Sequence, residues 1–145
     1  RYSRMISMTE YEFQKLLVDW LNHALPEKSL VHHSPNEGKR HVMYTQKLLD
    51  IGMKPGFPDL AIFVHQEFWW DGIASPIFVE VKAPGRGRLT EKQKQVQDQL
   101  RHLGCAVETI NKLSQLKFYL GNLIELRSNY RTAMLEKVCD TLSAL

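Results

Sequence analysis

The sequence predicts an α/β fold in which helices flank a small mixed sheet. Two patterns support this fold class: apolar residues at helical spacing near the amino end, and a continuous apolar run at 60–64 followed by an otherwise apolar strand at 77–82. The chain has 145 residues, a common length for one domain with its own core. We therefore expect a single domain at 9–145, preceded by a disordered or added tail at 1–8.

The first helix is predicted from its start signal and its apolar face. Thr9 and Glu12 match a capping box, in which the hydroxyl and the carboxylate each accept a hydrogen bond from a backbone N–H that lacks a helical partner. The apolar face repeats every three or four residues and comprises Phe13, Leu16, Leu17, Trp20 and Leu21.

The other elements follow from similar signals. Gly52 suits the end of one helix, and Thr90 suits the start of another that stops at Gly104. A hairpin loop at 69–72 is expected to join the two apolar runs. The remaining predictions are a strand at 30–33, a helix at about 43–51, a helix at 90–103, a strand at 105–110, and helices at 113–120 and 130–145.

The composition excludes several classes of protein. Hydrophobic residues make up 43% of the chain and charged residues 24%, which is ordinary for a folded domain and unlike a disordered chain. No apolar run approaches the roughly 20 residues needed to cross a bilayer, so we expect no membrane span and a cytosolic location. Cys105 and Cys139 are only two and lie far apart, which indicates neither a disulfide framework nor a zinc site and predicts buried, reduced thiols.

Three charged residues beside the apolar runs are candidates for chemistry. Alternate side chains of a strand share a face, so Glu80 and Lys82 point the same way. Charges at the end of a buried strand are costly to desolvate, and a partner, a metal or a substrate commonly compensates. Asp59 begins the neighbouring run after a Gly-Phe-Pro turn and supplies a second carboxylate. Two convergent carboxylates suit Mg²⁺ or Mn²⁺ better than zinc.

Such a site suits phosphodiester hydrolysis. A divalent cation polarises a phosphate oxygen and lowers the pKa of a bound water. Lys82 would orient that water or stabilise the charge, and the backbone carbonyl of Val81 would add an oxygen ligand. If a second metal binds, Glu10 on the first helix is the expected extra carboxylate.

Basic residues flank these candidates. The net charge of +3 and the pI near 8.9 permit a polyanionic partner. Beside a nuclease site, basic side chains would contact the phosphate backbone without reading sequence. The candidates for these contacts are Lys39, Arg40, Lys54, Arg86 and Arg88.

Pro58-Asp59 followed by Glu80-Val81-Lys82 resembles the signature of the PD-(D/E)XK nuclease superfamily, whose core is restriction-endonuclease-like. Flanking motifs narrow the resemblance, over roughly 9–110, to the VRR-NUC family. These motifs are Glu10 with Gln14, Pro35-Asn36-Glu37-Gly38-Lys39-Arg40, Gly52-Met53-Lys54-Pro55-Gly56-Phe57-Pro58-Asp59, Glu80-Val81-Lys82-Ala83, and Leu89-Thr90 with Gln93.

The resemblance implies that Asp59, Glu80 and Lys82 are catalytic, with Glu10 and Gln93 in support. Stand-alone members of the family, from phages and bacteria, are similar to Holliday-junction resolvases and other structure-selective endonucleases, and they dimerise. The chain is therefore expected to be a Mg²⁺- or Mn²⁺-dependent endonuclease that cuts branched DNA as a homodimer, in the cytosol of a bacterium or phage-infected host. The segment after 121 carries none of these motifs.

Each candidate also has a structural interpretation. Asp59 could cap a turn, and Glu80 and Lys82 could be part of a solvated cross-strand face. Gln93 suits a second capping box, and Glu10 could interact only with the helix dipole.

Two alternative functions share the basic surface: a nucleic-acid-binding module without chemistry, and a sequence-specific restriction-type endonuclease. The second would need base-reading elements for which the chain has little spare length. Gly85-Arg86-Gly87-Arg88 lacks the ending of a Walker loop, which argues against nucleotide hydrolysis. Adjacent strand residues face opposite ways, so we expect one of His32 and His33 to be packed. Trp69 and Trp70 are expected in the core or a dimer contact.

Overall fold

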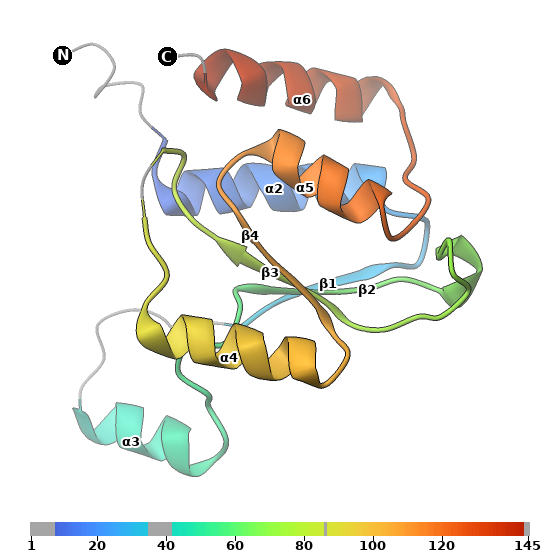
Figure 1. Ribbon diagram of the computed structural model, residues 1–145. Coiled ribbons are helices and arrows are strands. Elements are labelled where there is room, and N and C mark those ends of the chain that lie inside the picture. Colours follow the sequence, from blue (N-terminus) through green and yellow to red (C-terminus); the bar gives the residue numbers. More distant parts are fainter. Residues whose placement is uncertain (1–7, 35–41, 86, 144–145) are drawn as a thin grey trace, which may run out of the picture.

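A four-stranded sheet lies at the centre of the computed structural model, which describes residues 8–34, 42–85 and 87–143 (Figure 1). The strand order is β1-β2-β3-β4. β1 and β3 both pair antiparallel with β2, and β4 pairs parallel with β3, so the sheet is mixed. The strands are β1 (Leu30–His33), β2 (Leu60–Phe63), β3 (Ile77–Val81) and β4 (Ala106–Ile110).

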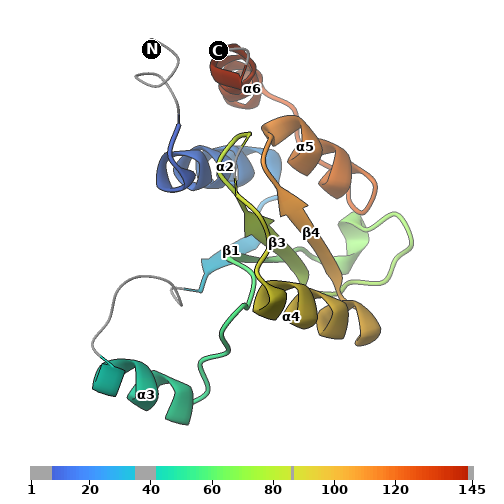
Figure 2. The ribbon, with the colours of Figure 1, turned by 60° about the vertical axis from the view of Figure 1, so that its left-hand side comes forward.

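Helices cover both faces of this sheet (Figures 1 and 2). Helices α2 and α5 lie on one face with α6 outside them, and α4 lies on the opposite face, while α3 stands away from the sheet. The α-helices of the described residues are α2 (Glu10–Ala24), α3 (Val42–Asp50), α4 (Glu91–His102), α5 (Leu113–Gly121) and α6 (Tyr130–Ser143). The predicted α/β class is confirmed, and the predicted helices and strands are present with small shifts at their ends.

Helix α2 begins as the sequence predicts. The backbone N–H of Glu12 donates to the Thr9 hydroxyl at 3.1 Å, and the backbone N–H of Thr9 donates to the Glu12 carboxylate at 3.2 Å. The backbone of Thr9, and then its side chain, hold the pKa of Glu12 below its ordinary value. The predicted apolar face is buried except at Leu16, which is only partly buried.

The connection between β2 and β3 is longer than a hairpin turn. It contains a 3₁₀ turn, Gln66–Phe68, followed by Trp69, which is buried and donates its indole N–H to the Val64 carbonyl at 3.1 Å. Trp70 is 64% exposed and donates to the Gly121 carbonyl at 2.8 Å. The expected antiparallel pairing of β2 with β3 is confirmed. The segment 69–72, predicted to be the whole hairpin loop, is only the middle of it.

The sheet divides the core into two parts. Ile77, Val79 and Val81 face the larger cluster formed with α2, α5 and α6. Phe78 faces the other way into a small cluster under α4, where its ring meets Phe57 edge to face at 5.3 Å between centroids. Even-numbered positions of β3 therefore face α4.

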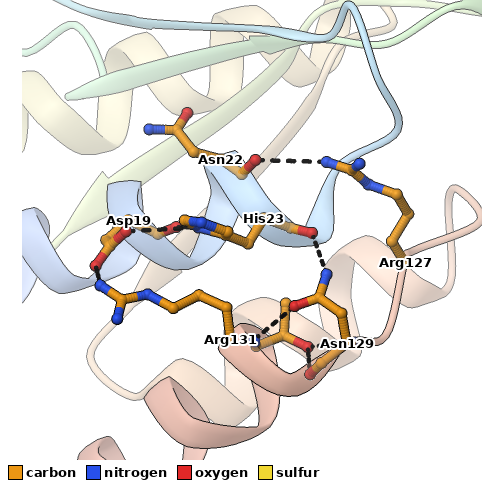
Figure 3. A network of polar contacts seen from close by, with 7 residues as sticks. Asp19, Asn22, His23, Arg127, Asn129 and Arg131 are labelled. Carbon is orange, nitrogen blue, oxygen red and sulfur yellow. Dashed lines mark hydrogen bonds and ion pairs between the residues drawn. The ribbon is translucent and has the colours of Figure 1, made fainter.

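Helix α6 is held against α2 by polar contacts as well as by apolar packing (Figure 3). Arg131 donates to the Asp19 carboxylate at 2.8 Å, and the Asn129 side chain donates to the His23 carbonyl at 3.0 Å. Cys139 on this helix is buried, as predicted, whereas Cys105 is only partly buried, and both are free thiols. No helix within the described residues is long and apolar enough to cross a membrane.

Candidate active site

Strand register places the candidate acids side by side. The last pair between β2 and β3 joins Leu60 to Val79, so one step further Asp59 comes opposite Glu80. Leu60 and Val79 belong to the core on the α2 side. Because neighbouring side chains of a strand alternate, Glu80 and Lys82 lie toward the α4 side, at the end of the sheet where α2 and α4 both begin (Figure 1).

These side chains are buried rather than solvated. Asp59 is 2% exposed, Glu80 is 0% exposed and Lys82 is 8% exposed. A solvated strand face that carries Glu80 and Lys82 is therefore excluded. Buried charges persist only where hydrogen bonds, counter-charges or a ligand offset the loss of hydration.

Gln93 of α4 bridges the two charged residues of β3. The Lys82 ammonium donates to Gln93 Oε1 at 3.0 Å, and Gln93 Nε2 donates to Glu80 Oε2 at 3.4 Å. A neutral amide suits this position because one end accepts and the other donates. Gln93 also accepts from the backbone N–H of Thr90 at 2.9 Å, so it completes the predicted capping box and contacts the charged pair at the same time.

A close approach of two backbones fixes α4 against the turn that leads to Asp59. A Cβ atom added to Gly56 would fall 2.7 Å from the carbonyl carbon and oxygen of Lys92, and the φ of Gly56 is +84°. Only glycine tolerates both conditions. The start of α4, which carries Gln93, is thereby packed against the turn that carries Asp59.

Asp59 is fixed by the neighbouring strand. Its Oδ2 accepts a hydrogen bond of 2.7 Å from the backbone N–H of Val81. The N–H and C=O of one strand residue point to the same side, so the Val81 carbonyl is also directed toward the Asp59 side of β3. This hydrogen bond runs to the neighbouring strand and not to the turn that precedes Asp59, so it differs from the turn-capping interpretation.

The donor set fits a hard divalent cation. It consists of the carboxylates of Asp59 and Glu80 with the carbonyl of Val81, all oxygen donors, as Mg²⁺ and Mn²⁺ prefer. In the described part of the chain, no three His, Cys, Asp or Glu side chains form a metal-binding group. A cation at this place would therefore be held by two carboxylates, a backbone oxygen and water, an arrangement that Mg²⁺ tolerates well.

Glu10 lies across a hollow from Asp59. The hollow has a volume of about 650 Å³, and Glu10, Gln14, His33 and Asp59 are among the residues that line it. Lys15 and apolar atoms of α2 complete its wall. Glu10 thus lines the same hollow as Asp59, but it does not join Asp59 and Glu80 in one three-acid cluster.

The predicted phosphate contacts are placed only in part. Lys54 and Arg88 are exposed, and Lys39, Arg40 and Arg86 lie outside the described residues. A Cβ atom on Gly87 would lie 3.1 Å from Cδ of Lys82. The segment that carries Arg88 therefore passes directly over the buried lysine.

Two features near the site were missed by the sequence analysis. Neither His32 nor His33 is packed, because both are exposed, and His33 is hydrogen-bonded at the site instead. Gln97 is 2% exposed and donates to the Thr109 hydroxyl at 3.0 Å. The helical spacing of four between Gln93 and Gln97 was the available signal that both amides face the sheet.

Comparison with known protein families identifies the family of the chain. Searches of curated proteins and of solved structures gave no significant match. The model of the VRR-NUC domain matches residues 5–112, a range that contains every side chain of the site and ends before α5. The chain therefore belongs to the VRR-NUC family, and its domain is of the nuclease type.

Proposed function

We propose that the chain is a divalent-metal-dependent endonuclease that hydrolyses phosphodiester bonds in branched DNA, such as a four-way junction or a flap. The observation that carries the proposal is the convergence of two buried carboxylates and a buried lysine at one end of the sheet. Aspartate, glutamate and lysine side chains are rarely buried so deeply, and buried charged residues that lie together are common at functional sites. Their position within a nuclease-type domain supports hydrolysis over simple binding.

Each residue has a distinct role in the proposed mechanism. When bound, a divalent cation such as Mg²⁺ or Mn²⁺ would polarise a phosphate oxygen of the DNA and lower the pKa of a bound water. Asp59, Glu80 and the Val81 carbonyl would hold that cation. Lys82, whose ammonium is oriented by Gln93 at 3.0 Å, would orient the water or offset the negative charge that develops on the phosphate.

Branched DNA and a homodimer are proposed together. The exposed basic residues at the site, Lys54 and Arg88, are suited to phosphate contacts that do not read bases, which favours recognition of shape. Two sites related by a two-fold axis would match the symmetry of a junction. The alternatives remain a binding module without chemistry and a restriction-type enzyme with base-specific contacts.

Cleavage assays with matched substitutions test this proposal. Labelled junction, flap and linear duplex DNA, each in two sequence contexts, would be incubated with Mg²⁺, Mn²⁺ or chelator. Asp59→Asn retains an oxygen that can accept from Val81, and Lys82→Met retains most of the side-chain volume. Because removal of one member of such a catalytic group commonly costs orders of magnitude, we expect both to lower kcat at least about 100-fold with the fold retained.

The controls are charge changes of the same kind away from the site. Asp140→Asn and Lys137→Met alter exposed residues of α6 and should leave cleavage unchanged. Binding without cleavage under either metal would favour the binding module. Cleavage of one sequence context only would favour the restriction-type enzyme, and cleavage that survives Asp59→Asn would place the metal elsewhere. Sedimentation of the same sample gives the oligomeric state.

A further inference from the structure

A polar bridge joins α2 to the end of β1 at the hollow that contains Glu10 and Asp59. Gln14 Nε2 lies 3.0 Å from His33 Nδ1, and the same Nδ1 lies 3.0 Å from the backbone carbonyl oxygen of Asp59. Gln14 follows Glu10 by four residues, so both side chains lie on the same side of α2. The bridge therefore connects the helical turn that carries Glu10 to the strand end that carries Asp59.

The direction of these hydrogen bonds follows from the acceptor. A backbone carbonyl only accepts, so His33 Nδ1 carries the hydrogen in its contact with Asp59, and Nε2 is the acceptor of the neutral ring. The amide of Gln14 can present its oxygen to the same N–H by a half-turn. The backbone N–H of Ser34 donates to the same Asp59 carbonyl at 3.0 Å.

Asp59 is consequently held at both ends. Its carbonyl accepts from His33 and Ser34, and its carboxylate accepts from the Val81 N–H at 2.7 Å. The bridge lies at the last pair of the β1–β2 ladder, which joins His33 to Leu60. Beyond that pair, the backbone of Asp59 is held from the β1 side by the Ser34 N–H at 3.0 Å and by the His33 side chain at 3.0 Å.

We propose that Gln14 and His33 are positioning residues that fix the separation of Glu10 and Asp59 across the hollow, and that they act on metal affinity through Asp59 rather than by touching the substrate. This inference rests on the proposed function for its metal site. Hydrogen-bonded supports of metal ligands contribute roughly 10- to 100-fold to metal affinity or activity. Both side chains are at least partly exposed, so their removal should affect the unfolding free energy little.

Two substitutions of His33 separate its ring nitrogens. In His33→Asn the amide nitrogen lies near the place of Nδ1, and in His33→Gln it lies near the place of Nε2. Mn²⁺ binding would be measured by calorimetry on the full chain without DNA, and the Mn²⁺ concentration for half-maximal cleavage would be measured in parallel. We expect His33→Gln and Gln14→Leu to weaken Mn²⁺ binding roughly 10-fold, and His33→Asn to stay within about 3-fold of the wild type.

His32→Asn is the matched control, because His32 is exposed and its side chain faces away from that of His33. The inference is overturned if His33→Gln binds Mn²⁺ normally while His33→Asn does not, since His33 would then act through Nε2. It is also overturned if Mn²⁺ binding is unchanged in every variant and only the melting temperature falls. Calorimetry needs no cleavage, so a wild type that binds Mn²⁺ but cuts no DNA would contradict the proposed function alone.

Discussion

The buried polar group formed by Glu80, Lys82 and Gln93 shows how a single neutral side chain can stabilise two buried charges. Direct contact of the ammonium and the carboxylate would leave the acid less available to a cation. The amide between them satisfies both partners through opposite ends, at 3.0 Å and 3.4 Å. The position also explains why the capping interpretation and the active-site interpretation of Gln93 are compatible.

Gln93→Leu should lower both stability and activity. It removes the acceptor of a buried ammonium, and the loss of a hydrogen bond to a charged group costs about 1.5–3 kcal/mol. Thr90→Ala is the matched variant, because it removes the hydroxyl that caps α4 at 3.2 Å but leaves the Gln93 side chain in place. It should cost about 1 kcal/mol and leave kcat nearly unchanged. Urea unfolding and cleavage rates measure both effects, and equal losses of kcat would show that Gln93 acts only as a cap.

At the scale of elements, local patterns predicted more than long-range ones. The starts of α2 and α4 were predictable because a capping box depends on residues three apart, and both boxes are confirmed. The pairing of Asp59 with Glu80 depends on the register between strands separated by a loop of 13 residues, 64–76, and no local pattern encodes it. The placement of each acid beside a buried strand and the resemblance to a family predicted that pair, but neither could indicate the contact between His33 and Asp59.

The turn between α3 and β2 offers a pair of glycines that separates backbone strain from packing. Gly52 and Gly56 both have positive φ, yet a Cβ atom on Gly52 meets nothing within 4 Å, whereas one on Gly56 meets Lys92 at 2.7 Å. Gly52→Ala should therefore cost only the conformational penalty, about 1–2 kcal/mol.

Gly56→Ala should cost about 1–3 kcal/mol more and should also lower kcat, because the turn must shift away from α4 and carries Asp59 with it. Thermal unfolding and single-turnover cleavage of the two variants measure these effects. A normal kcat in Gly56→Ala, with stability reduced as expected, would show that the site tolerates movement of this turn.

At the scale of the whole molecule, α6 lies outside the residues that the family model matches. The family match ends at residue 112, but α6 buries part of α2, where Trp20 donates its indole N–H to Glu136 at 3.3 Å. Asn129 has two roles in this contact: its Oδ1 accepts from the Thr132 N–H, and its Nδ2 donates to the His23 carbonyl, each at 3.0 Å (Figure 3). The side chain of Asn129 thus both caps α6 and attaches it to α2.

Cys139 makes the opening of α6 measurable. It is 3% exposed, and burial, followed by the charges of Asp140 and Glu136, raises the pKa of its thiol to about 11. Since the thiolate is the reactive form, Cys139 should react with a thiol reagent at pH 8 only when α6 separates from α2. The background would be Cys105→Ser, so that a single thiol is followed.

In that background, Asn129→Ala should raise the rate of Cys139 labelling roughly 10-fold, because it removes a helix cap worth about 1 kcal/mol together with a contact to α2. Arg131→Ala removes only the partly exposed ion pair with Asp19 and should raise the rate by less than about 3-fold, since such pairs contribute about 0–1 kcal/mol. Cleavage should be normal in both variants, because every residue of the proposed site lies outside α6. Equal labelling rates in the two variants would show that apolar packing alone holds α6, and a loss of cleavage in Asn129→Ala would show that α6 supports the site through α2.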